Sequence, residues 1–118
     1  MSVNSIIRCI DSPITMTQLK EIAAERFGDM VKGVVDVELK IMALGGELHA
    51  DEEAYLLEKG SKQANLWGIN IYVSEPLPQA IEFDSMINVR PSQNNRSRAV
   101  EDKNLQEQII RIVQSLII

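Results

Sequence analysis

The chain has 118 residues, of which 45% are hydrophobic, and a formal net charge of -5. This length and hydrophobic content suit one compact domain over residues 1–118 with its own core. The acidic balance disfavours general nucleic-acid binding and attachment to anionic membranes, because both usually need a basic surface. The single cysteine, Cys9, excludes an internal disulfide and a multi-cysteine zinc site.

The N-terminal residues lack the basic start and the apolar run of a signal peptide. No later stretch approaches the ~20 apolar residues that a membrane span requires. We therefore expect a soluble cytoplasmic protein that does not bind membranes.

A short strand and a helix are the first elements that the sequence predicts. Residues 5–10 are rich in isoleucine and precede the turn-forming run Asp-Ser-Pro, which is typical of a brief strand beside the main sheet. Thr15 and Gln18 have the spacing of a capping box, and apolar residues follow at helical intervals. A helix is therefore predicted over residues 16–27.

A long strand and a short helix follow. Between Val31 and Ala43 an apolar residue or glycine stands at every second position, which predicts one half-buried strand, bent or interrupted at Gly33. Acidic residues in a first helical turn and Gly60 as a terminator predict a helix over residues 51–59.

Two neighbouring strands and a last helix complete the chain. Alternating patterns predict strands over residues 67–73 and 81–89, and apolar spacing predicts a helix from about Lys103 with Asp102 as its cap. Trp67 stands on the apolar register and is expected in the core. The polar side of the sheet, with Asp36, Asn70 and Asn88 among others, is expected to face water.

The predicted order is β-α-β-α-β-β-α. It indicates an α+β fold with a mixed, largely antiparallel sheet of about four strands. The odd-numbered apolar positions of the strands are expected to pack against the first and last helices.

The stretch GGELHADEE, residues 45–53, contains the only histidine. A histidine near several carboxylates should hold its proton more tightly than a free one, and Glu47 could orient the ring. His49 and Glu47 are therefore candidate catalytic residues. An equally simple interpretation is that the acids serve the helix dipole and that His49 is a surface residue without a chemical role.

The sequence does not favour a metal or a cofactor. Glu47, His49 and Asp51 would share one side of an extended segment, but the chain offers a single histidine nitrogen, and transition-metal sites usually gather three or four protein ligands. Gly45 and Gly46 open neither a dinucleotide fingerprint nor a P-loop. We expect no metal and no cofactor.

The stretch RPSQNNRSR, residues 90–98, carries three arginines and no acid in an acidic protein. Guanidinium groups match phosphate or carboxylate, and each charge-assisted hydrogen bond contributes about 1.5 to 3 kcal/mol. We therefore expect an anionic or phosphate-bearing small ligand here. The predicted ligand-binding residues are Arg90, Gln93, Asn95, Arg96, Ser97, Arg98 and, from the neighbouring rim, Lys62. The alternative is a solvated loop whose arginines pair with surface acids, each pair contributing only about 0 to 1 kcal/mol.

Whether the two stretches form one site depends on strand direction. If the strand that ends near Leu44 runs antiparallel to the strand that begins at Trp67, both stretches lie at one end of the sheet. If the helix between them makes a parallel crossover, His49 lies at the opposite end, and only the arginine loop remains a candidate.

The apolar residues of the last helix indicate a different function. Ile110, Ile117 and Ile118 lie outside or at the margin of its main apolar face, which indicates burial against a partner, most simply in a homodimer. The alternative to ligand binding is therefore a non-catalytic, homodimeric interaction module.

Four stretches together resemble a family of small uncharacterised prokaryotic proteins classed as a domain of unknown function. They are GDMVKGVVDVE (28–38), GGELHADEE (45–53), GSKQANLWGIN (60–70) and EFDSMINVRPSQNNRSR (82–98). The resemblance covers most of the chain and implies no particular reaction. The family pattern has glycine where this chain has Asn94, which adopts a left-handed turn less cheaply than glycine does.

Overall fold

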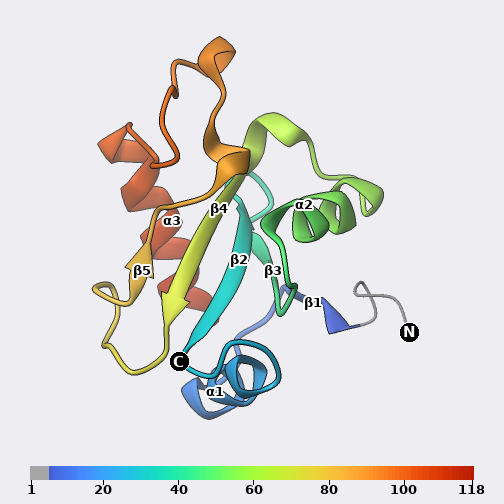
Figure 1. Cartoon of the computed structure of the whole chain (residues 1–118), viewed down its shortest axis with the longest axis vertical. Helices are drawn as coiled ribbons and strands as arrows, with labels where there is room; N and C mark the ends of the chain where they lie inside the picture. The colour runs from blue at the N-terminus through green and yellow to red at the C-terminus, as the bar shows by residue number, and fades with distance from the viewer. Residues whose placement is uncertain (1–5) are drawn as a thin grey trace.

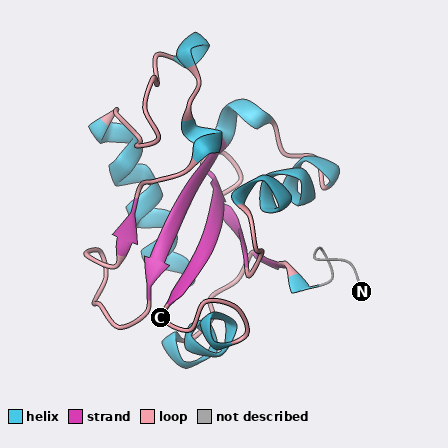
Figure 2. Ribbon diagram, in the orientation of Figure 1, coloured by secondary structure: helices cyan, strands magenta, loops and turns pink. Residues whose placement is uncertain are grey.

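A five-stranded antiparallel sheet with helices on both faces forms the fold, which a computed structural model describes for residues 6–118 (Figures 1 and 2). The strands lie in the order β1-β3-β2-β4-β5. They span Arg8–Ile10 (β1), Met30–Asp36 (β2), Ile41–Leu44 (β3), Leu66–Tyr72 (β4) and Ile81–Glu82 (β5). The α-helices span Met16–Ala24 (α1), His49–Glu58 (α2) and Lys103–Leu116 (α3). Short 3-10 helices span Gln63–Asn65 (η2), Met86–Asn88 (η3) and Pro91–Gln93 (η4).

The α+β class is confirmed, but the sheet has five strands and no parallel pair, and the order is β-α-β-β-α-β-β-α. The predicted first strand is an edge strand of the main sheet, paired with β3. Ser5, its predicted first residue, lies outside the described residues. The first helix begins where it was predicted, and both hydrogen bonds of the Thr15–Gln18 capping box are present. It ends at Ala24, before the predicted end at residue 27.

The single strand predicted between Val31 and Ala43 is wrong, because these residues form the β2–β3 hairpin. Asp36 causes the reversal: its Oδ1 accepts the N–H groups of Glu38 and Leu39, each at 2.9 Å, as aspartate does in turns. The four-residue turn also reverses the alternation. Met42 and Leu44, instead of Ile41 and Ala43, therefore share the main core with Val35.

Two apolar clusters hold helices against opposite faces of the sheet. The larger one joins α1 and α3 to β2, β3 and β4, and it includes Trp67, as predicted. The smaller one joins Leu56 of α2 to Val34, Ala43 and Leu66. Figure 1 shows α2 and α3 on the two sides of the sheet.

The polar side of the sheet faces water only in part, since Glu38 and Glu82 are exposed as predicted. Asp36, Asn70 and Asn88 are buried, because α2 and the segment after β5 cover this face. Gly68 permits the close approach, since a Cβ atom there would lie 2.6 Å from the Cβ atom of Ser85.

The strand predicted over residues 81–89 ends at Glu82. Beyond this residue, the side chain of Asn88 takes the place of the hydrogen bonds that a longer strand would make to β4. Asn88 Oδ1 accepts the Gly68 N–H at 2.8 Å, and Asn88 Nδ2 donates to the Gly68 carbonyl at 3.0 Å. The backbone of β4 therefore stays paired beyond the end of β5.

The last helix uses most of its apolar surface inside the fold. Ile117 is only 4% exposed and forms a parallel bridge with Ile14, and Ile110 packs against the main core. Ile118, by contrast, is 72% exposed. The apolar strip that suggested a homodimer is therefore largely internal. Asp102 caps the helix as predicted. None of the helices over residues 6–118 combines the length and apolar character that a membrane crossing requires.

Candidate functional site

A buried carboxyl group, that of Glu52, connects the first turn of α2 to the loop that follows β3. Glu52 has no exposed surface, and its Oε2 accepts the Gly46 N–H at 2.9 Å. A Cβ atom at Gly46 would lie 2.7 Å from Glu52 Cγ, so only glycine fits there. This packing explains the second glycine of GGELHADEE, Gly46.

His49 lies in this first turn and is only 8% exposed. Its Nε2 lies 2.8 Å from the Ile69 carbonyl oxygen, and because a carbonyl only accepts, Nε2 carries the hydrogen. The Nδ1 atom of the neutral ring is then an acceptor. Burial lowers the pKa of His49, and the hydrogen bond to Ile69 opposes this shift. The prediction of a tightly held proton on His49 is therefore wrong.

Glu47, the second candidate catalytic residue, does not orient the ring. Its Oε2 lies 3.8 Å from Arg26 Nη1, in an ion pair whose carboxylate is largely exposed. The only carboxyl group buried near the start of α2 is Glu52, and burial raises the pKa of Glu52 well above its ordinary value.

Arg90 has a structural role at the start of β4. Its guanidinium donates to the carbonyl groups of Gln63, Ile87 and Leu66, and it stacks on the Trp67 ring at 4.2 Å from the centroid. Burial lowers the pKa of Arg90, whose donors are already committed to these carbonyls.

The amides of the arginine loop are also used internally. Asn95 is buried, and its Nδ2 donates to the carbonyl groups of Asn88 and Ala99 at 2.7 Å each. Gln93 accepts from Arg90 and donates to the Ala64 carbonyl. The backbone N–H groups of Arg96 and Ser97 both donate to the Glu101 carboxylate, which fixes the bend of the backbone at these two residues.

Arg98 differs from the other two arginines. Its Nε donates to Asp84 at 2.6 Å, while its two terminal nitrogens donate to no other described residue. It retains donors for a ligand. The side chains of Arg96 and Lys62 are exposed, and neither lines the cavity that Arg98 shares with His49.

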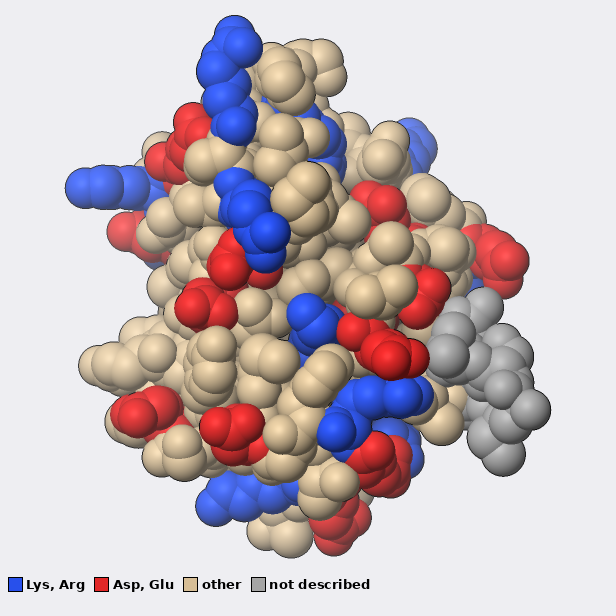
Figure 3. Space-filling view, viewed as in Figure 1, with Lys and Arg blue, Asp and Glu red and all other residues tan. Residues whose placement is uncertain are grey.

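His49 and Arg98 line one cavity of about 210 Å³, which we call the Lys32 cavity. Its other lining residues are Lys32, Leu48, Ala50, Ser85, Met86 and Ile87. The cavity lies between the start of α2, strand β2 and η3, on the face shown in Figure 3, where basic and acidic side chains alternate.

The topology explains why His49 and Arg98 meet although β3 and β4 run parallel. Both strands are antiparallel to β2, so α2 makes the parallel crossover that was expected to carry His49 to the far end. However, β3 ends at Leu44, level with Gly33 and Ile69 in the middle of the sheet. The helix therefore starts above the centre of β4, where the 83–98 segment also packs.

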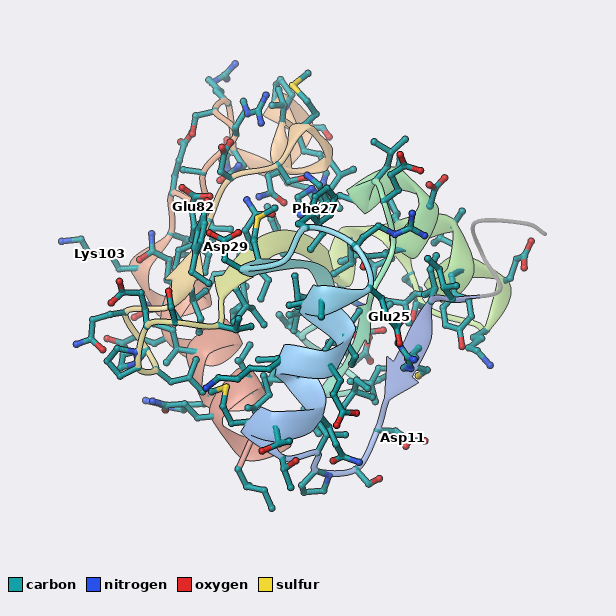
Figure 4. All side chains as sticks on the ribbon, turned by 60° about the horizontal axis from the view of Figure 1, so that its bottom comes forward. Asp11, Glu25, Phe27, Asp29, Glu82 and Lys103 are labelled. Carbon is teal, nitrogen blue, oxygen red and sulfur yellow. The ribbon has the colours of Figure 1, made fainter. Side chains whose placement is uncertain are left out.

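Lys32 also lines the cavity, although the sequence did not point to it. It points to the α2 face of β2, its ammonium lies 5.6 Å from the centroid of the Phe27 ring, and it makes no ion pair among residues 6–118. Figure 4 shows Phe27 in the loop between α1 and β2. The alternation in β2 predicted the face that Lys32 occupies, but not the cavity above it.

The rim of the cavity is apolar. Leu48 and Met86 are 56% and 66% exposed, and they reach the cavity from α2 and η3 respectively. Large apolar side chains exposed on both sides of a basic cavity are typical of a binding site. Residues 6–118 contain no group of three or more His, Cys, Asp or Glu side chains placed to hold a metal ion.

Comparison with known proteins identifies the family. The family model described as "Protein of unknown function (DUF5674)" matches residues 8–116. Searches of curated proteins and of solved structures found no match. The match spans both helical faces of the sheet and every residue of the Lys32 cavity. The chain therefore belongs to the DUF5674 family, a domain family of unknown function.

Proposed function

We propose that the protein binds a small amphipathic anion in the Lys32 cavity. The observation that carries this proposal is that Lys32, which makes no ion pair among residues 6–118, and Arg98, whose terminal nitrogens keep free donors, both line a cavity with an exposed apolar rim. Lys32 and Arg98 hold the negative group, and Leu48 and Met86 contact the apolar part. The proposal keeps the expected anionic ligand but moves it from the whole arginine loop to Arg98.

The charges around the cavity favour an anion. Among residues 6–118 Lys32 makes no ion pair, although its charge acts on the nearby carboxyl group of Glu52, and Arg98 shares only one of its three nitrogens with Asp84. Hydrogen bonds from charged donors are roughly twice as strong as neutral ones, so two such donors fix the position of a carboxylate or phosphate. His49, whose ring is neutral at pH 7 because burial lowers its pKa, adds an acceptor and no charge.

The size of the cavity limits the ligand. Sites for drug-sized ligands usually enclose about 300–1,000 Å³. A cavity of about 210 Å³ therefore suits a smaller molecule, such as a short-chain carboxylate or alkyl phosphate.

Isothermal titration calorimetry with butyrate, hexanoate, hexyl phosphate and inorganic phosphate tests the proposal. We expect hexanoate and hexyl phosphate to bind more tightly than butyrate and inorganic phosphate, because each additional buried CH₂ group contributes about 0.8 kcal/mol. Lys32→Met retains the aliphatic stem and should weaken hexanoate binding by at least about tenfold, the lower value of one charge-assisted hydrogen bond.

Arg96→Gln is the matched control, because Arg96 belongs to the same loop and does not line the cavity. It should leave the affinity for hexanoate unchanged. Equal losses in Lys32→Met and Arg96→Gln would indicate a general charge effect and would contradict the proposal. An absence of heat with all four probes at millimolar concentration would also contradict it.

A further inference from the structure

A second cavity system lies on the other side of the sheet, along α3. One cavity of about 350 Å³ has Val37, Lys40, Gln108 and Arg111 among its walls. The next, of about 330 Å³, has Val37, Trp67, Asn94, Asp102 and Leu105 among its walls. Both cavities are lined by Val37, and their other walls include residues from the N-cap Asp102 to Ser115 of α3, so they adjoin along this helix, and we call the pair the α3 groove.

The two ends of the α3 groove carry opposite charges. Lys40 and Arg111 lie at one end, and Asp102 lies at the other. Among the described residues Lys40 makes no ion pair, and the pair of Arg111 with Glu107 is long, at 3.8 Å, and exposed. The cations at this end are therefore free to meet a carboxylate.

The distance between the charged ends sets the length of a ligand. Arg111 stands nine positions after the N-cap Asp102, which corresponds to about 13 Å along the helix axis at about 1.5 Å per helical residue. An extended peptide rises about 3.3 Å per residue, so roughly four residues span the same distance.

The walls between the charged ends suit a peptide backbone. Trp67, Leu105 and Ile112 supply apolar surface. The side-chain amides of Gln108 and Asn94 hydrogen-bond to no other described residue, so each offers a donor and an acceptor. Apolar pockets with a few free amides are what an extended chain needs for side-chain contact and main-chain hydrogen bonds.

We propose that the α3 groove binds an extended peptide segment of about four residues with a positive charge at one end and a carboxylate at the other. The carboxylate lies between Lys40 and Arg111, and the positive charge lies near Asp102. This site is separate from the Lys32 cavity, which lies on the α2 face of the sheet.

The test uses the acetylated and amidated tetrapeptide KAVE, titrated into the ¹⁵N-labelled full-length protein. We expect the amide signals of Lys40, Asn94 and Arg111 to shift, and the dissociation constant to follow from the titration. Arg111→Gln should weaken KAVE binding by about fivefold, the upper value for one exposed ion pair, and should have no effect on the peptide KAVQ.

Asp102→Asn tests the other end of the groove, since asparagine caps a helix as well as aspartate does and only the charge is lost. This variant should weaken KAVE by about fivefold and leave the peptide QAVE unaffected. Lys32→Met should leave all three peptides unaffected, which separates this proposal from the function of the Lys32 cavity.

Three results would overturn the inference. The first is a wild-type protein that shows no shift at millimolar KAVE. The second is a set of shifts confined to the residues of the Lys32 cavity. The third is a shift of the same α3 signals with protein concentration in the absence of peptide, which would assign the groove to a second copy of the chain.

Discussion

Glu52 is a buried acid that holds α2 in place by packing and by one hydrogen bond, without an ion pair to any residue among 6–118. Its Oε2 accepts one backbone N–H, and its Oε1 has no hydrogen-bond partner among residues 6–118. Burying a carboxylate is costly, so the folded state favours the protonated form and the pKa of Glu52 is raised. The same residue therefore anchors α2 and makes the stability of the fold depend on pH.

Glu52→Gln should remove this dependence. A raised pKa means that the folded state binds more protons than the unfolded state between the ordinary value of 4.5 and the raised value, so the stability of the wild type falls as the pH rises through this window and is constant above it. Glutamine keeps an acceptor for Gly46 and carries no titratable group. We expect Glu52→Gln to be more stable than the wild type at pH 8 and to lose that advantage at pH 4, in urea denaturation curves. A constant difference across this range would contradict the assignment.

Asn94 occupies the left-handed region, with φ 60° and ψ 27°. Asparagine tolerates this conformation better than other residues with a side chain, whereas a β-branched residue does not. We expect Asn94→Val to lose about 1–2 kcal/mol in chemical denaturation and Asn94→Gly to stay within about 1 kcal/mol of the wild type. Equal stability of the Val and Gly variants would show that the turn does not require a left-handed residue.

At the scale of elements, the segment between β5 and α3 is a loop that substitutes for a strand. The stretch that looked like a ligand loop holds itself together through Asn88, Arg90 and Asn95, whose side chains bond mainly to backbone groups. Its polar composition therefore reflects the pairing of backbone groups. Only Arg98 remains available at the Lys32 cavity.

Asn88→Ala should open the edge of β4. The substitution leaves the N–H and carbonyl groups of Gly68 without their side-chain partners, and each unpaired buried group costs about 1–3 kcal/mol. We expect a loss of roughly 3 kcal/mol and fast hydrogen exchange at the Gly68 amide. Slow exchange at Gly68 in a folded Asn88→Ala protein would show that another group pairs with β4.

Local signals in the sequence predicted the helices well and the sheet only in part. The Thr15–Gln18 box and the Asp102 cap act within one helical turn, so their spacing is visible in the chain. The β2–β3 hairpin depends on the Asp36 side chain bonding its own turn, which an uninterrupted alternation of apolar residues concealed. The sequence also named His49 and Arg98 as candidates. It could not reveal Lys32 beside them, because that contact depends on where β3 ends and on how α2 crosses the sheet.

At the scale of the whole molecule, α3 and the last residues close the main core. Ile117 is buried against this core, so Ile117→Glu places a charge inside it and should cost at least about 3 kcal/mol. Ile118→Glu, one residue further along and exposed, should change the stability by less than about 0.5 kcal/mol. Thermal denaturation of both variants tests this difference. If Ile117→Glu instead keeps its stability and only its molar mass in light scattering falls from that of a dimer to that of a monomer, Ile117 belongs to a dimer interface.

We propose a separate binding surface on each face of the sheet. The α2 face holds the Lys32 cavity, with Lys32, the partly free Arg98 and an apolar rim, and the α3 face holds a groove with charges at both ends. The cavity is the central claim, since residues from three distant parts of the chain converge on it.

A crystal structure of the protein grown with hexanoate tests this claim most directly. We predict that the carboxylate lies within hydrogen-bond distance of Lys32 Nζ and the terminal nitrogens of Arg98, with the alkyl chain against Leu48 and Met86. Density for hexanoate at another site, or an empty Lys32 cavity at a saturating concentration, would contradict the account.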